Sequence, residues 1–155
     1  MEIRRSALAS HSAEAMFDII DGPEHYPEFL PWCAEATLIS RDADMTSATL
    51  VVRYAGLNFR FATENPKQRP VKMRINLLDG PFAQFDGEWL IQPLASDACR
   101  IDFLLRYEFH NRFATTLSSS VFAHIADTLV DAFIDRAESL KAAAQPSNGA
   151  QQIAE

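Results

Sequence analysis

Hydrophobic and polar residues alternate along the middle of the chain. Residues 50–109 repeat this alternation in several runs, and a period of two is typical of strands with one buried face. Turn-forming residues such as Asn65-Pro66 and Asp79-Gly80-Pro81 separate the runs. A similar stretch covers residues 2–9. The pattern predicts a first strand there and an antiparallel meander of about six strands over residues 33–110.

Three other segments have helical spacing instead. Ser12 is a suitable N-cap for a short helix whose apolar side chains follow at positions 16, 19 and 20. We expect a second short helix over residues 24–30, which Pro31 ends. Residues 112–141 predict a long helix with one wide apolar face and one acidic face.

A long helix after a meander must bury its apolar face on the sheet. The order β-α-α-β6-α therefore predicts an α+β fold in which a curved sheet of about seven strands surrounds the final helix. We expect residues 1–141 to form one domain and residues 142–155 to be a disordered tail. The inward residues either fill a core or line a cavity, and the alternation is the same in both cases.

Composition narrows the class of protein. The chain has 155 residues, 48% of them hydrophobic and 23% charged, which fits one globular domain. The net charge of −7 argues against a strongly basic nucleic-acid binder. No apolar run is long enough to span a membrane, and no targeting segment is recognisable, so we expect a cytoplasmic protein.

One local run of cations interrupts the acidic balance. It contains Lys67, Arg69, Lys72 and Arg74, with no acidic residue among them. The run is either a solvated loop and strand face or a contact for an anionic surface. Such a surface is the phospholipid of the cytoplasmic membrane or the phosphates of RNA.

Several residue groups are compatible with catalysis or metal binding but have simpler explanations. Cys33 and Cys99 are more consistent with packed thiols than with a disulfide. Ser120, His124 and Asp127 have the residue types of a catalytic triad, yet they lie on the polar face of the long helix. The histidines lack metal-ligand spacing. We expect neither a metal nor a catalytic residue here.

Several spaced motifs carry a resemblance to a known family. They are Tyr26-Pro-Glu-Phe-Leu-Pro-Trp-Cys33, Leu78-Asp-Gly-Pro-Phe82, Gly87-Glu-Trp89, Cys99-Arg-Ile-Asp-Phe103 and Tyr107-Glu-Phe109. Over residues 2–141 the chain resembles the helix-grip fold of the START-like superfamily of polyketide cyclases/dehydrases and lipid-transport domains. More narrowly, it is similar to the branch of coenzyme-Q-binding proteins and ribosome association toxins.

The resemblance implies a hydrophobic tunnel between the sheet and the last helix. It also implies binding of ubiquinone or a related isoprenoid lipid, without catalysis and without another cofactor. The tunnel would be lined by Phe29, Trp32, Phe59, Phe61, Met73, Ile75, Phe85, Trp89, Phe103, Leu105, Tyr107, Val121, Ile125 and Leu129. Phe29 and Trp32 either plug one end of the fold or form the tunnel entrance.

Three functions remain open at this point. The first is a non-enzymatic carrier or chaperone for a ubiquinone-like lipid in respiration. The second is a ribosome-associated regulator that contacts the large subunit. The third is a cyclase- or dehydrase-like enzyme, for which Tyr107 and His110 are the only acid/base candidates on or next to the inward register.

Overall fold

The computed structural model describes residues 1–144, apart from the side chains of residues 116 and 117. The expected tail at 142–155 lies largely outside the described residues. The strands are β1 (Glu2–Ala9), β2 (Cys33–Arg41), β3 (Met45–Tyr54), β4 (Leu57–Gln68), β5 (Lys72–Asp79), β6 (Phe82–Ala95) and β7 (Ala98–Phe109). The helices are α1 (Ala13–Ile20), the 3₁₀ helix η1 (Pro23–Glu28) and α2 (Thr116–Ala144).

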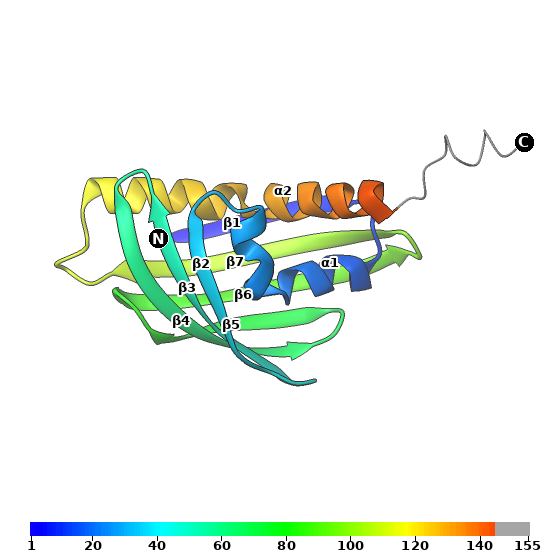
Figure 1. Cartoon of the computed structure of the whole chain (residues 1–155), viewed down its shortest axis with the longest axis horizontal. Helices are drawn as coiled ribbons and strands as arrows, with labels where there is room; N and C mark the ends of the chain where they lie inside the picture. Colours follow the sequence, from blue (N-terminus) through cyan, green and yellow to red (C-terminus); the bar gives the residue numbers. More distant parts are fainter. Residues whose placement is uncertain (145–155) are drawn as a thin grey trace, which may run out of the picture.

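The strands form one antiparallel sheet in the order β1-β7-β6-β5-β4-β3-β2. Strands β2 to β7 form a meander, and β1 pairs with β7 at the other edge. Helix α2 runs along the sheet, and α1 and η1 lie beside it (Figure 1). This is the helix-grip α+β architecture that the alternation and the long final helix predict.

Most element boundaries follow the sequence pattern. Strand β1 has the predicted bounds, and the Ser12 hydroxyl accepts a hydrogen bond from the backbone N–H of Ala15 at the start of α1 (3.1 Å). Helix α2 begins at Thr116 rather than at 112, because the Thr115 hydroxyl accepts from the N–H of Ser118 (2.9 Å) and caps the helix there.

The prediction of a turn at Asn65-Pro66 was wrong, because both residues lie inside β4. The backbone N–H of Lys67 donates to the carbonyl of Asp44 (3.0 Å), so pairing with the neighbouring chain segment continues past the proline. The second short helix is also different. It is a 3₁₀ helix that ends at Glu28, and Pro27 inside it has no N–H to donate.

A closely packed aromatic core fills most of the space between the sheet and α2. Trp89 stacks on Phe103 with ring centroids 4.3 Å apart, and Phe133 of α2 meets Trp89 at 5.4 Å. A second cluster lies toward the start of α2, where Phe122 contacts Phe82 (5.4 Å) and Tyr107 (4.8 Å). Burial of these rings is a large apolar contribution to stability.

Candidate functional site

A small interior cavity lies between the sheet and α2. Its volume is about 80 Å³. Most of the predicted tunnel residues line it: Trp32, Phe61, Met73, Ile75, Phe85, Trp89, Phe103, Leu105, Ile125 and Leu129. These side chains come from the inward faces of four strands, from the chain before β2 and from α2, so the cavity is where the expected tunnel would be.

Four predicted residues do not line the cavity. Phe59 and Tyr107 belong to the aromatic cluster around Phe122, which fills the space they face. Val121 also lies outside the lining. Phe29 packs against Phe133 (5.7 Å) on the side of α2 nearest α1. The strand register therefore predicts that a side chain points inward, but it does not predict whether empty space remains beside that side chain.

The cavity has further lining residues that sequence reasoning missed. They are Pro23, Tyr26, Ala48, Leu50, Thr63, Asn65, Phe122, Ala126 and Phe133. Thr63 and Asn65 continue the odd-numbered inward row of Leu57, Phe59 and Phe61 on β4. That register was the signal that could have found them, but the assumed turn at Asn65-Pro66 ended the row too early.

The size of the cavity decides between a filled core and an open tunnel in this state. A water molecule takes about 30 Å³ of liquid, and an engineered cavity of about 150 Å³ binds benzene. A cavity of about 80 Å³ therefore has room for only a few non-hydrogen atoms. The interior is mostly a filled core, and any larger occupant must displace side chains or α2.

One corner of the cavity is polar. Thr63 is only 5% exposed. The side-chain oxygen Oδ1 of Asn65 is buried and accepts no hydrogen bond from any described protein group. The remaining wall is formed mainly by apolar and aromatic side chains. An apolar cavity with a few polar groups is the usual composition of a small-molecule site.

A buried ion pair lies on the same inward row, beyond this polar corner. The Lys67 ammonium donates to Oδ2 of Asp21 (2.6 Å) and to the Thr46 hydroxyl (2.9 Å), and that hydroxyl donates to Oδ1 of Asp21 (2.5 Å). The Lys67 side chain is 5% exposed. The expectation that Lys67 contacts an anionic surface therefore needs correction, because its charge lies inside the protein.

The other cations of the basic run also face carboxylates. Arg69 forms two hydrogen bonds with Asp18, both 2.8 Å long. Lys72 and Arg74 lie 3.8 Å and 3.3 Å from the carboxylate oxygens of Glu88. These three residues remain on the surface, but their acidic partners reduce the attraction that they exert on a membrane or a polyanion.

One wall of the cavity faces a surface groove. Trp32, Ile125 and Leu129 line both the interior cavity and a groove of about 330 Å³ beside α2. The groove also contains Pro31 and His124. The three shared side chains therefore lie between the interior cavity and this groove, whereas Phe29 lines neither space.

The triad-like residues of α2 do not form a catalytic arrangement. Asp127 forms an ion pair with Arg5 of β1. His124 lines the surface groove, and Ser120 is exposed. The aspartate therefore helps to hold α2 against the edge of the sheet.

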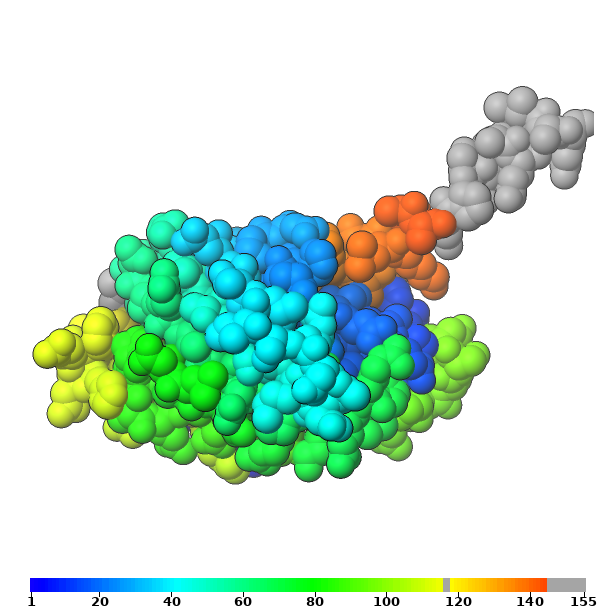
Figure 2. All heavy atoms as spheres, turned by 60° about the horizontal axis from the view of Figure 1, so that its bottom comes forward, coloured from blue at the N-terminus to red at the C-terminus, as the bar shows by residue number. Residues whose placement is uncertain are grey.

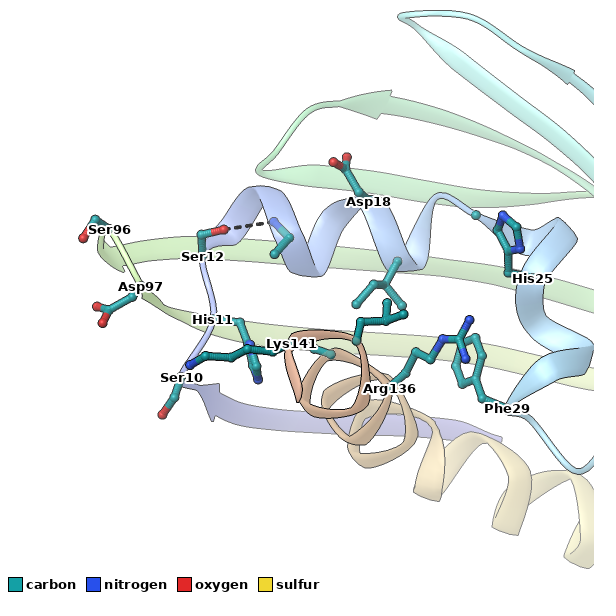
Figure 3. A pocket seen from close by; sticks show the side chains of 15 residues that line it. Ser10, His11, Ser12, Asp18, His25, Phe29, Ser96, Asp97, Arg136 and Lys141 are labelled. Carbon is teal, nitrogen blue, oxygen red and sulfur yellow. Dashed lines mark hydrogen bonds between the residues drawn. The ribbon is translucent and has the colours of Figure 1, made fainter. Parts of the chain in front are cut away.

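A second, open groove of about 580 Å³ lies between α1 and the C-terminal part of α2 (Figure 3). Nε2 of the buried His11 lies 2.9 Å from Oε1 of Glu138. Arg136 donates to Glu28 (2.8 Å), and its guanidinium lies 4.9 Å from the centre of the Phe29 ring. These contacts join α2 to the elements that precede β2, so we interpret them as structural.

The two thiols and the Tyr107 hydroxyl are held in neutral, buried forms. Both thiols are free and buried, and burial raises the pKa of Cys33 to about 11 and also raises that of Cys99. Burial raises the pKa of Tyr107, whose hydroxyl donates to the Ser119 carbonyl (3.3 Å). His110 lies in a separate surface groove, away from the cavity.

Within residues 1–144, no three His, Cys, Asp or Glu side chains are grouped so that they could hold a metal ion. In the same residues, no helix is both long and apolar enough to cross a membrane.

The fold agrees with what sequence comparison finds. Residues 9–134 match the family model described as polyketide cyclase / dehydrase and lipid transport. The chain belongs to this family. Members share a helix-grip domain, and the cavity described above lies between the two parts of that domain, the sheet and α2.

Relatives within the family carry two kinds of names. Ribosome association toxin RatA of Pseudomonas aeruginosa is 34% identical over 89% of this chain and 96% of its own length. RatA of Escherichia coli K12 is 34% identical over 92% and 90%. Coenzyme Q-binding protein COQ10 homolog B of Xenopus laevis is 28% identical over 86% of this chain, which covers 56% of that protein.

Solved structures show the same fold at lower identity. A START superfamily protein from Mycobacterium smegmatis has a TM-score of 0.75 at 19% identity, covering 90% of this chain and 98% of its own. The Zhui aromatase/cyclase from Streptomyces sp. R1128 has a TM-score of 0.76 at 12% identity, covering 89% and 93%. These similarities establish the fold alone.

Proposed function

We propose that this family member is a non-enzymatic binding protein for a lipophilic small molecule of the isoprenoid quinone kind. The observation that supports it is the apolar cavity between the sheet and α2, with its one polar corner at Thr63 and Asn65. The coenzyme Q-binding relatives support the same ligand class. We further propose that the protein takes up its ligand at the inner face of the cytoplasmic membrane.

The free energies of transfer between bilayer, protein and water explain how such a protein would work as a carrier or chaperone. An isoprenoid tail gains little by moving from a bilayer to an apolar protein interior, since both are dry. Its escape into water costs roughly 25 cal/mol for each Å² of apolar surface that becomes exposed. Uptake is then nearly neutral in free energy, and loss to water is strongly opposed.

Uptake requires the cavity to widen. The filled interior leaves about 80 Å³, so the ligand would have to move the wall of Trp32, Ile125 and Leu129 outward. The wall adjoins a surface groove, so displacement there would connect the interior with solvent or a membrane. Small shifts of a helix that packs against a sheet are a common way to open such sites.

The two tryptophans of the chain provide a direct test. Trp32 and Trp89 are the only tryptophans and both line the cavity. Titration with a ubiquinone that carries one isoprene unit should quench their fluorescence saturably, at one equivalent per chain. Acrylamide, a small polar quencher, should quench weakly and without saturation. Linear, non-saturating quenching by the quinone would contradict the proposal.

Association with the ribosome is a second candidate, because relatives at 34% identity and nearly full coverage carry that name. The surface that we propose for contact with the ribosome lies at the end of the molecule where the loop after β7 projects (Figure 2). Arg60 and Arg112 line one groove there, together with Asp79. Arg53 shares their exposed character and lies opposite Asn58, next to Arg60 on the same sheet face.

Ribosome co-sedimentation tests this second candidate. Replacement of Arg53, Arg60 and Arg112 by Gln should reduce sedimentation with the large subunit and flatten its salt dependence. The matched control replaces Arg69, Lys72 and Arg74, which face carboxylates, and should leave sedimentation unchanged. Equal loss in both variants would indicate a general charge effect. No sedimentation of the wild-type protein would eliminate this candidate.

A further inference from the structure

Asn65 is an unusual residue for the wall of a filled core. Its Oδ1 is buried without a hydrogen-bond partner among the described protein groups. A buried polar atom without a partner destabilises the folded state, and most such atoms in proteins are paired. A leucine of similar size would avoid that cost. The position therefore points to a partner that is not part of the protein chain.

Two donors near Asn65 are already engaged. The Lys67 ammonium and the Thr46 hydroxyl both donate to Asp21. These bonds fix the end of the inward row on which Asn65 lies, because β3 pairs Thr46 directly with Asn65. The backbone of Asn65 is thus fixed beside a buried network whose donors already have acceptors, and an occupant of the cavity can supply the missing donor.

We propose that the occupant presents a hydroxyl group to Oδ1 of Asn65, so that the cavity selects a hydroquinone over the corresponding quinone. This inference rests on the proposed lipid-binding function and specifies its head group. The apolar part of the ligand would contact Phe61, Ile75 and Trp89, which line the same cavity. A quinone offers only acceptors, so it would leave Oδ1 unpaired and place two oxygens against each other.

A preference of this kind follows from unpaired polar groups rather than from shape. A site built to pair with a substrate hydroxyl discriminates against the analogue that lacks it, because the buried group of the site then stays unpaired. One neutral hydrogen bond corresponds to about a tenfold difference in affinity. We therefore expect the hydroquinone to bind at least tenfold more tightly than the quinone.

Calorimetric titration under nitrogen tests the inference. The probes are the ubiquinone with one isoprene unit and its quinol. The wild-type protein should prefer the quinol by tenfold or more, and Asn65→Leu should bind both probes with equal affinity. The matched control is Asn58→Leu, on the opposite face of the same strand, which should keep the wild-type preference.

Thermal melting without ligand adds an independent readout. Asn65→Leu should melt at a higher temperature than wild type, because it removes an unpaired buried oxygen. If it does not fold, Asn65→Ala serves the same purpose, since it also lacks the acceptor and must lose the preference. Equal binding of quinol and quinone by wild type, or a preference that survives both substitutions, would overturn the inference and leave the proposed function standing. Binding of neither probe would overturn both.

Discussion

Cys33 illustrates how burial controls chemistry at the scale of one residue. It lies at the start of β2, next to Trp32, and its thiol donates to the carbonyl of Glu35 (3.4 Å). Burial raises its pKa from 9.0 to about 11. The thiol is therefore protonated at neutral pH, and it behaves as a small apolar group rather than as a nucleophile.

This pKa shift predicts an alkaline loss of stability. The folded protein keeps the Cys33 proton up to about pH 11, whereas the unfolded chain releases it near pH 9. The free energy of unfolding should thus be unaffected by this thiol below pH 9 and fall by about 2 kcal/mol between pH 9 and 11. Urea unfolding of wild type and Cys33→Ala measures this, and the variant should show the smaller slope. Equal slopes would show that Cys33 does not titrate as described.

Ile125 allows a test of the wall between cavity and groove. It is 3% exposed and lines both spaces. In Ile125→Lys the flexible stem can extend into the groove, where Asp131 lies, so we expect a folded protein with reduced lipid content. Val130, equally buried but lining neither space, is the control. Val130→Lys should unfold, because the lysine ammonium at this position cannot reach solvent.

Thermal melting and lipid content are measured on the same samples. An Ile125→Lys variant that is as unfolded as Val130→Lys would contradict the position of the wall. A folded variant with full lipid content would place the ligand elsewhere.

At the scale of elements, one buried ion pair connects α1, β3 and β4. Asp21 at the end of α1 binds both Thr46 of β3 and Lys67 of β4. The pair also borders the polar corner of the cavity. A buried pair is weak evidence for a net gain in stability, but removal of one partner leaves an uncompensated charge.

Lys67→Met should therefore lower the free energy of unfolding by about 3–5 kcal/mol, measured by urea denaturation. The double variant Asp21→Asn/Lys67→Met should lose less than the single variant, since no buried charge remains. Arg69→Met breaks the exposed pair with Asp18 and should cost less than about 1 kcal/mol. A cost for Lys67→Met as small as that for Arg69→Met would show that the pair is solvated.

The same ion pair shows where sequence reasoning works and where it ends. Alternation predicted six strands and the inward register well, because the period of two is local. It could not reveal that Lys67 is buried, since the partner Asp21 is 46 positions away. The turn signal of Asn65-Pro66 was overridden by such long-range contacts, and the polar corner was lost with it.

The cavity is a second feature that the sequence alone could not predict. Phe59 and Trp89 both face inward, yet only Trp89 lines the space. The difference depends on how Phe122 of α2 fills the region near Phe59 (6.1 Å between centroids). Periodicity fixes the direction of a side chain, whereas remaining volume depends on the sizes of all its neighbours.

At the scale of the whole molecule, the helix-grip fold combines a largely filled interior with one wall that borders a surface groove. The sheet and α2 enclose about 80 Å³, and the three side chains Trp32, Ile125 and Leu129 separate that space from the groove outside. The net charge of −7 disfavours broad attraction to polyanions. The overall charge of the molecule therefore does not favour contact with phosphate backbones.

The most direct test of this account is mass spectrometry of the lipid extracted from natively purified protein. We predict about one equivalent of an isoprenoid quinol or quinone per wild-type chain, and a strongly reduced amount in folded Ile125→Lys. The extract from Asn58→Leu should match wild type. Wild-type protein that carries no lipid, and that takes none from vesicles containing isoprenoid quinol, would contradict the central claim that the interior of this fold is a ligand site.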